Sequence, residues 1–318
     1  MILKQIYKNI FFKTLDISNF DKRYLNSIHK EKNLVILNLH RVSDNKNLFY
    51  PSLSPKLFNE LLKYIVKNFN VITFREIEEY RNSKKPNIIL SFDDGFYDFV
   101  EYAMPLLDKY NISVNQNIIP SCIESGKPVW DVMLGDFLNQ VPIKIVNQLK
   151  FPHFEMQLTT NNKIQFGLAL THYLKNRPKE KREILWKQID TIIKKENIEL
   201  TRMLNRDEVI EISKTHEIGC HSYSHESMGI ESKEFFENDF SKCQNYFKER
   251  LNLPLDIYAF PSGSYKKYQL DFLRESGIKH ILLVNENYSI YNRDIYNRFT
   301  FYGDSISEIK IRALGWKK

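Results

Sequence analysis

Short apolar runs that each end in a cluster of polar residues recur along this chain of 318 residues. The run at residues 34–39 ends in a histidine and an arginine, and the run at 88–90 leads into two adjacent aspartates. Continuous apolar runs of this length are typical of strands buried on both faces of a parallel sheet. Because amphipathic helical patterns lie between the runs, the sequence predicts an α/β fold, a parallel sheet or barrel with its helices outside.

The alternation of strands and helices breaks between about residues 136 and 205, where no strong buried strand is found. This stretch predicts a small hairpin at 154–166 and amphipathic helices at 166–174 and 180–196. We therefore expect an N-terminal helical extension over 1–33 and a distorted (β/α) barrel over 34–318, with an inserted helical lid at about 136–205. The predicted barrel strands are 34–39, 71–73, 88–92, 114–119, 217–220, 257–260 and 280–284.

The composition is that of an ordinary globular protein, with 27% charged and 42% hydrophobic residues. The net charge of +7 is modest for this length, so we expect a solvated lysine-rich surface and no nucleic-acid partner. No apolar run approaches the roughly 18 residues that a membrane span needs, and the first residues lack the pattern of a secretory signal. The three cysteines form no CxxC pair, which favours reduced thiols and a cytoplasmic protein.

The first residues carry an apolar stripe at helical spacing. Ile2, Leu3, Ile6, Ile10 and Phe11 share one face of a predicted helix, and lysines occupy other positions. The stripe fits a basic amphipathic helix lying on an anionic membrane, and hence peripheral contact with the inner membrane face. It also fits a helix that packs its stripe on the domain's own surface, which is the more common arrangement.

Two polar clusters far apart in sequence indicate the chemistry. SFDDG at 91–95 places Asp93 and Asp94 at the end of one predicted strand, and HSYSH at 221–225 places His221 and His225 at the end of another. Each cluster alone is ambiguous, since Asp-Asp-Gly is a common turn and a histidine pair can lie on a surface helix. Together, one carboxylate and two imidazoles make a catalytic metal site with a position open for water, and the remaining aspartate can accept a proton from that water.

Other polar residues also follow predicted strands. His40 and Arg41 come after the first strand, and Pro261 and Ser262 come after a later one. Because the carboxyl ends of parallel barrel strands converge on one face, we expect these residues near the aspartates and histidines, as substrate-binding or supporting groups. Two roles are open for the His40 side chain: it forms a hydrogen bond to Asp93, or it only fills a gap between polar groups.

The two clusters resemble motifs of the NodB-type polysaccharide deacetylase family, carbohydrate esterase family 4. SFDDG is similar to the family's TFDDG motif and HSYSH to its H[ST]xxH motif. Looser similarities point to the exopolysaccharide or O-antigen-cluster branch: LNLHRV at 37–42, KPVWD at 127–131 and YAFPSGS at 258–264. The resemblance covers most of residues 34–283. It implies a NodB-type barrel, in which Asp93 is the base and one divalent ion, Zn²⁺ or else Co²⁺, Ni²⁺ or Mn²⁺, is held by Asp94, His221 and His225.

Two features of the family are missing from this sequence. Many members carry an arginine that orients the base in the third motif, where this chain has Ala259, and Ser262 stands in place of the family tyrosine. We expect Arg41 or His40 to replace that arginine. A late family motif supplies a histidine general acid, but Val284 ends the matching strand and the direction of His280 is open. The general acid is therefore unassigned.

Trp130 and Asp131 precede the expected insertion. The indole ring can stack on a sugar, or it can anchor the insertion to the barrel, as large aromatic side chains more often do. The resemblance predicts a hydrolase that removes an N-acetyl or other small acyl group from a sugar of a surface polysaccharide or its lipid-linked precursor. The alternative is a catalytically weak member that binds glycan or acts as a scaffold in polysaccharide assembly.

Overall fold

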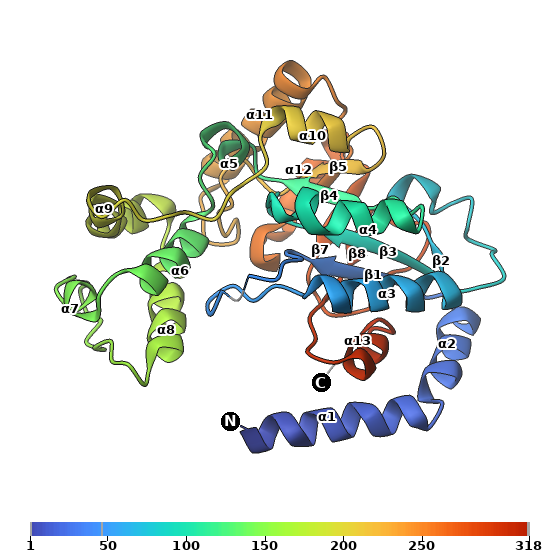
Figure 1. Ribbon diagram of the computed structural model, residues 1–318. Coiled ribbons are helices and arrows are strands. Elements are labelled where there is room, and N and C mark those ends of the chain that lie inside the picture. Colours follow the sequence, from blue (N-terminus) through green and yellow to red (C-terminus); the bar gives the residue numbers. More distant parts are fainter. Residues whose placement is uncertain (1, 46, 317–318) are drawn as a thin grey trace.

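The computed structural model describes residues 2–45 and 47–316, so Met1 and the last two residues of the predicted barrel lie outside it. A parallel sheet curls into a distorted barrel with helices around it, which confirms the predicted fold class (Figure 1). Its strands run in the order β8-β7-β6-β5-β4-β3-β1-β9, and β2 pairs with β3. Their bounds are β1 (Leu34–Leu39), β2 (Asn70–Val71), β3 (Asn87–Phe92), β4 (Asn115–Ile118), β5 (Glu217–Cys220), β6 (Ile257–Ala259), β7 (His280–Leu283), β8 (Ile295–Asn297) and β9 (Phe299–Thr300).

The centre of the barrel is the pairing of β1 with β3. Both strands are buried along their whole length, and they pair in register from Leu34 opposite Asn87 to Leu39 opposite Phe92. Since the strands are parallel and end at the same level, the polar residues that follow each of them emerge at the same end of the barrel.

The last strands join the two ends of the sheet. β8 pairs with β7 and β9 pairs with β1, and a single residue, Arg298, separates β8 from β9. The segment 295–300 therefore changes partner at Arg298 and closes the barrel. The sequence analysis missed both strands, because they are very short and follow a polar stretch rather than beginning a long apolar run.

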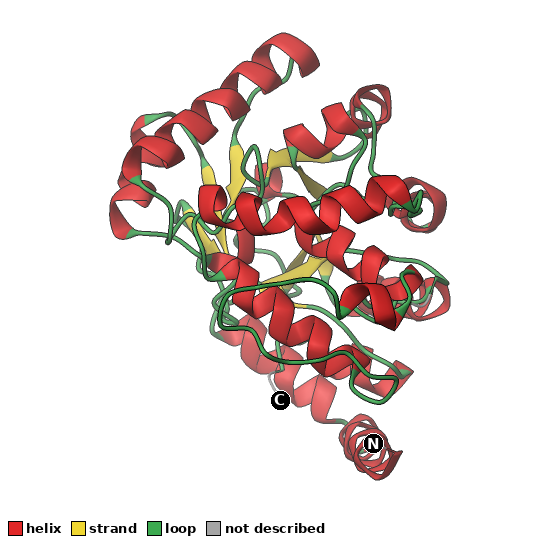
Figure 2. Cartoon of the chain, turned by 90° about the vertical axis from the view of Figure 1, so that its left-hand side faces the viewer, coloured by secondary structure: helices red, strands yellow, loops and turns green. Residues whose placement is uncertain are grey.

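Helices cover the outside of the barrel (Figure 2). Two of them have a serine cap at their N-terminus: Ser54 Oγ accepts from Leu57 N, and Ser305 Oγ accepts from Glu308 N. The helices of this layer are α3 (Pro55–Asn68), α4 (Met104–Lys109), α10 (Arg206–Ile212), α11 (Lys233–Asn245), α12 (Lys267–Glu275) and α13 (Ile306–Arg312). Wider π-helical turns at Phe99–Ala103 and Tyr246–Leu251 adjoin α4 and α11.

The stretch between β4 and β5 is helical, with α5 (Pro120–Ser125), α6 (Trp130–Gln140), α7 (Ile143–Val146), α8 (Lys163–Lys175) and α9 (Lys179–Lys195). Helices α6 to α9, called the insertion here, project from the barrel (Figure 1) and share a core of their own, which includes Phe137, Phe166 and Leu170. The predicted hairpin at 154–166 is wrong, because the structure has no strand in those residues. The Asn147 side chain instead bonds both backbone groups of Leu158, at 2.8 and 3.0 Å.

The N-terminal segment forms two helices, α1 (Ile2–Ile17) and α2 (Phe20–Lys30). α1 lies against α13 at the edge of the molecule (Figure 1). Within residues 2–45 and 47–316, no helix combines the length and the apolar character that crossing a bilayer requires.

Close packing between strands makes Gly219 of β5 sensitive to substitution. A Cβ at this position would lie 2.2 Å from Oδ1 of Asn117 in β4 and 3.0 Å from Cβ of Ile257 in β6. We expect Gly219→Ala to lower the free energy of unfolding by about 1–3 kcal/mol, the usual range for overpacking, measured by denaturant titration. The substitution should cost less in an Asn117→Ala background, because the closest atom is then gone. An equal loss in both backgrounds would contradict this explanation.

Candidate active site

Asp93 and Asp94 follow β3 and are both buried. The backbone N–H of Asp93 still donates to Leu39 O, at 2.9 Å, so it continues the pairing with β1. Asp94 and Gly95 then take left-handed conformations, with φ of 77° and 80°. Glycine adopts this conformation at no steric cost but aspartate does not, so Asp94 stores backbone strain at the point where the chain leaves the strand.

Asp93 is held by a buried arginine. Arg298 Nη1 and Nη2 donate to Oδ1 and Oδ2 of Asp93 at 2.7 and 2.8 Å, and Asn117 Nδ2 donates to Oδ1 at 2.8 Å. Burial by itself raises the pKa of Asp93, but the charge of Arg298, then that of His221, and the hydrogen bonds from Arg298 outweigh it. The pKa of Asp93 is therefore held well below its usual range, so the carboxylate is ionised at neutral pH and fixed in orientation.

Arg298 does what the sequence analysis expected of Arg41 or His40. For Arg41 this expectation is wrong, because Arg41 Nε donates to Asp98 Oδ2 at 2.6 Å and its guanidinium lies over the ring of Phe96. The one sequence signal for Arg298 is an arginine between Tyr296 and Phe299, inside a short apolar stretch where a charge needs a partner.

The two histidines follow β5. His221 Nδ1 lies 2.9 Å from Ala259 O, which makes it the hydrogen-bond donor and leaves Nε2 with a free lone pair. Nε2 of His221 and Nε2 of His225 lie 3.6 and 3.4 Å from Oδ1 of Asp94. Burial lowers the pKa of both histidines to about 4, so both rings are neutral at physiological pH.

The loop that carries the histidines is fixed from α11. Oδ1 and Oδ2 of Asp239 accept from Tyr223 N and Ser224 Oγ, each at 2.8 Å, and Ser222 Oγ accepts from His225 N at 2.7 Å. Ser222 and His225 are both left-handed, with φ of 56°. These hydrogen bonds hold a tight turn that returns the second imidazole towards the first, whose ring centroid is 4.9 Å away.

The predicted ligands fit a divalent metal ion. One ligand atom from each of Asp94, His221 and His225 lies within 4.8 Å of the others. Oδ1 of Asp94, which faces both histidines, is buried without a hydrogen-bond partner, whereas Oδ2 accepts from Tyr50 Oη at 2.6 Å. A buried carboxylate oxygen without a donor, opposite two neutral imidazoles, is a donor set that suits Zn²⁺. Tyr50 was not predicted, since it belongs to an irregular loop.

The structure places the remaining predicted residues differently. His40 is half-buried, its ring centroid is 5.9 Å from that of Tyr50, and its charge acts on the pKa of both Asp93 and His221, so it borders the site. Asp131 likewise acts on the pKa of His225. Pro261 and Ser262 form a tight turn after β6, in which Pro261 is buried and Ser262 is exposed and left-handed.

Trp130 packs within the insertion. Its ring centroid is 6.1 Å from that of Trp186, and the guanidinium of Arg182 lies over it at 4.8 Å. Arg182 Nη2 in turn pairs with Oε1 of Glu226 at 2.7 Å, and both side chains are buried. Trp130 and Arg182 thus connect the insertion to the residue that directly follows His225.

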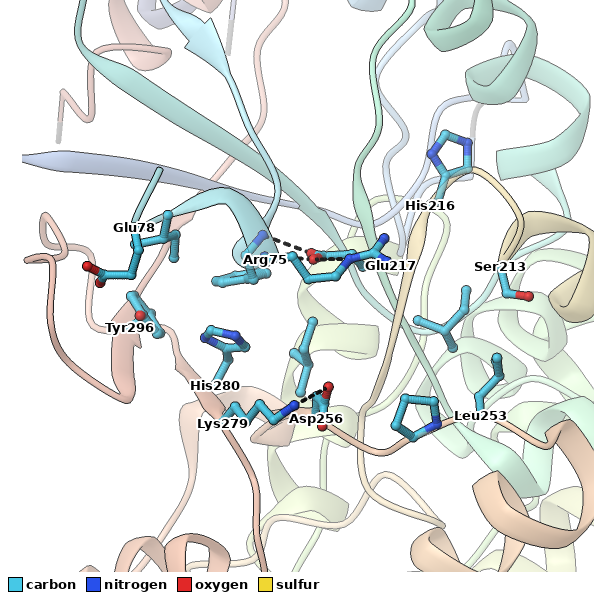
Figure 3. Close-up of a pocket in the computed structure, with 15 residues that line it drawn as sticks. Arg75, Glu78, Ser213, His216, Glu217, Leu253, Asp256, Lys279, His280 and Tyr296 are labelled. Carbon is cyan, nitrogen blue, oxygen red and sulfur yellow. Dashed lines mark hydrogen bonds and ion pairs between the residues drawn. The ribbon is translucent and has the colours of Figure 1, made fainter. Parts of the chain in front are cut away.

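A cavity of about 430 Å³ lies at the opposite end of the barrel, where β5, β6 and β7 begin (Figure 3). His280 is the first residue of β7 and points into this cavity, close to Phe74 and Tyr296 (Figure 3). It is therefore remote from Asp93 and Asp94, which follow the carboxyl end of β3, and it cannot be the general acid of that site.

Comparison with known proteins gives one family and a common fold. Residues 173–281 match the polysaccharide deacetylase family, and the matched part contains both histidines. The predicted resemblance is therefore confirmed. No curated protein matches the sequence.

The solved structures that share the fold include a Streptococcus pyogenes deacetylase, PplD, in complex with acetate (16% identity, 89% of this chain and 98% of that chain, TM-score 0.59). IcaB from Ammonifex degensii is also similar (15% identity, 89% and 97%, TM-score 0.56). So is a de-N-acetylase from Aggregatibacter actinomycetemcomitans (16% identity, 87% and 99%, TM-score 0.53). At these identities the likeness establishes the barrel fold.

The buried pair of Arg298 and Asp93 should be strongly coupled. Arg298→Met leaves the carboxylate without its counter-ion, so we expect the free energy of unfolding to fall by about 3–5 kcal/mol, measured by denaturant titration. In an Asp93→Asn background the same substitution should cost much less, because no buried charge is left unpaired. Equal costs in the two backgrounds would show that the pair contributes no coupling energy.

Proposed function

We propose that this protein, which resembles the polysaccharide deacetylases in sequence and shares their fold, is a metal-dependent hydrolase that removes an N-acetyl or other small acyl group from a sugar. The observation that carries the proposal is the buried cluster of Asp94, His221 and His225 next to a carboxylate, Asp93, that an arginine holds ionised. A binding protein has no use for strained, desolvated polar groups in this arrangement.

The residues divide the chemistry between them. A divalent ion held by Asp94, His221 and His225, most suitably Zn²⁺ with Co²⁺, Ni²⁺ or Mn²⁺ as alternatives, would lower the pKa of a water molecule towards about 7 and polarise the acyl carbonyl. Asp93 is the general base, and its position is set by Arg298 and Asn117. The turn at Pro261 and Ser262 follows β6 at the same end of the barrel, where a backbone N–H can stabilise the oxyanion.

His40 is our candidate for the general acid. It follows β1 at the level where Asp93 follows β3, it is only half-buried, and its ring centroid lies 5.9 Å from that of Tyr50, whose hydroxyl donates to Asp94. A half-buried imidazole can exchange protons with solvent and still reach a leaving amine. His280, the histidine that the sequence analysis considered for this role, is excluded by its place at the other end of the barrel.

For the substrate, we propose a sugar of a surface polysaccharide or of its lipid-linked precursor. The family match supports a polysaccharide, and two of the similar structures are named as a deacetylase and a de-N-acetylase. The three cysteines are free and buried, which is compatible with the cytoplasmic location that we keep as part of the proposal.

The second candidate is a catalytically weak family member that binds glycan or acts as a scaffold. Two missing residues favour this candidate. Ala259 stands where many family members have an arginine, and Val284 stands where they have a histidine. Arg298 removes the first of these reasons, because it makes the contact with the base from another strand segment.

Metal content separates the two candidates without knowledge of the sugar. Purified protein supplied with Zn²⁺ should hold about one ion per chain, and His225→Ala should lose it because a ligand is gone. Asp93→Asn should keep the ion but release no acetate from N-acetylated oligosaccharides. His29→Ala, at an exposed position of α2, is the matched control and should retain both. Absence of the ion from the wild-type protein would instead support the scaffold.

If His40 is the general acid, His40→Ala should lower kcat by about 10²–10⁴-fold with little change in KM or in metal content. Added imidazole should restore part of the rate, because it can donate the missing proton. The rates are measured by acetate release on whichever N-acetylated oligosaccharide the wild type hydrolyses. An unchanged kcat would assign the acid to another group.

A further inference from the structure

Helix α1 docks on the barrel through its charged side. Lys8 Nζ pairs with Oε2 of Glu308 at 2.9 Å, and both carboxylate oxygens of Asp16 lie 3.2 Å from Lys310 Nζ. Phe12, only 2% exposed, fills the contact between these pairs. The side of α1 that carries its one acidic residue is therefore turned towards α13.

The opposite side of α1 is apolar and open to solvent. Ile6, Ile10 and Ile17 fall within about 40° of one another at 3.6 residues per turn, and aromatic residues continue the surface on one flank. We call this surface the apolar face of α1; its exposed fractions are Ile6 47%, Tyr7 71%, Ile10 57%, Phe11 39% and Ile17 72%. Of the two alternatives for the stripe, packing on the domain's own surface is thus wrong for the stripe residues whose side chains the structure describes.

The exposed charge on this side of α1 is positive. Lys13 is exposed beside the isoleucines. The acidic Asp16 is withdrawn into the contact with Lys310. An apolar helix face with aromatic residues, lysine at its border and no exposed acid is the composition of a helix that lies in the plane of an anionic membrane surface.

We propose that α1 binds the protein peripherally to an anionic lipid bilayer, with the apolar face buried at the boundary between headgroups and acyl chains. Figures 1 and 2 both show α1 at one edge of the molecule, so a flat surface can reach it along its length. A second copy of this chain is a poorer occupant, because pairing two apolar faces brings their lysines together without an acidic partner. The inference rests on α1 alone and stands apart from the proposed reaction.

Vesicle flotation with the full chain tests the proposal. The protein should float with vesicles of phosphatidylcholine and phosphatidylglycerol, much less with phosphatidylcholine alone, and less at high salt, because the lysines contribute electrostatically. Ile10→Glu should weaken binding at least tenfold, and Lys13→Glu should weaken it on anionic vesicles. Ile184→Glu is the matched control, since Ile184 is equally apolar and well exposed on α9 in the insertion, and it should float like the wild type.

Other outcomes would overturn the proposal. Equal flotation of Ile10→Glu and wild type would show that α1 is not the contact. A wild type that ignores vesicles but sediments as a dimer, with Ile10→Glu as a monomer, would assign the face to a second copy. Because Ile10 is exposed, its substitution should leave the melting temperature unchanged, so loss of flotation can be separated from loss of folding.

Discussion

The buried pair between Arg298 and Asp93 connects the closure of the barrel to the chemistry of its site. Arg298 stands where the last strand segment changes its partner from β7 to β1, and its exposed fraction is 0%. Burying two charges costs free energy that only good geometry offsets. Here the guanidinium meets both carboxylate oxygens, and it also donates to Ser91 Oγ at 3.0 Å and towards Leu283 O. The interaction that positions the proposed base therefore also ties β3, β7 and the closing segment together.

Four residues at the same end of the barrel have strained backbones. Asp94, Ser222, His225 and Ser262 all have positive φ, although none of them is glycine. Each such residue costs of order 1–3 kcal/mol and persists only where its surroundings fix it. Tyr50 and Asp239 supply part of that support, by hydrogen bonds to Asp94 and to the histidine loop. The folding free energy of the barrel thus offsets the cost of these backbone conformations, which set the directions of the Asp94 and His225 side chains.

The sequence predicted those parts of the site that follow predicted strands. Asp93 and Asp94 come directly after β3 and His221 directly after β5, and the parallel pairing of β3, β4 and β5 brings the ends of these strands together. Arg298 and Tyr50 escaped prediction because they belong to a two-part closing strand and to an irregular loop, whose place depends on the finished barrel. Asn117 lies inside β4, in a run of amides that is itself an unusual signal for a buried strand.

Two errors have a common physical origin. The hairpin at 154–166 failed because its last residues belong to α8, and the backbone of Leu158 in the preceding loop bonds the side chain of Asn147 and not a partner strand. The packing of the apolar stripe of α1 failed because another side of the helix, with the buried Phe12 and two ion pairs, lies against the barrel. Periodicity shows that a helix has two different faces, but which face turns inward depends on partners that are distant in sequence.

The buried ion pair between Arg182 and Glu226 connects the insertion mechanically to the histidine loop. Glu226 directly follows His225, so a force that moves α9 away from the barrel is transmitted along one covalent bond of the main chain to an imidazole of the proposed metal site. The orientation of α9 on the barrel and the backbone position of His225 are therefore linked through the Arg182–Glu226 ion pair.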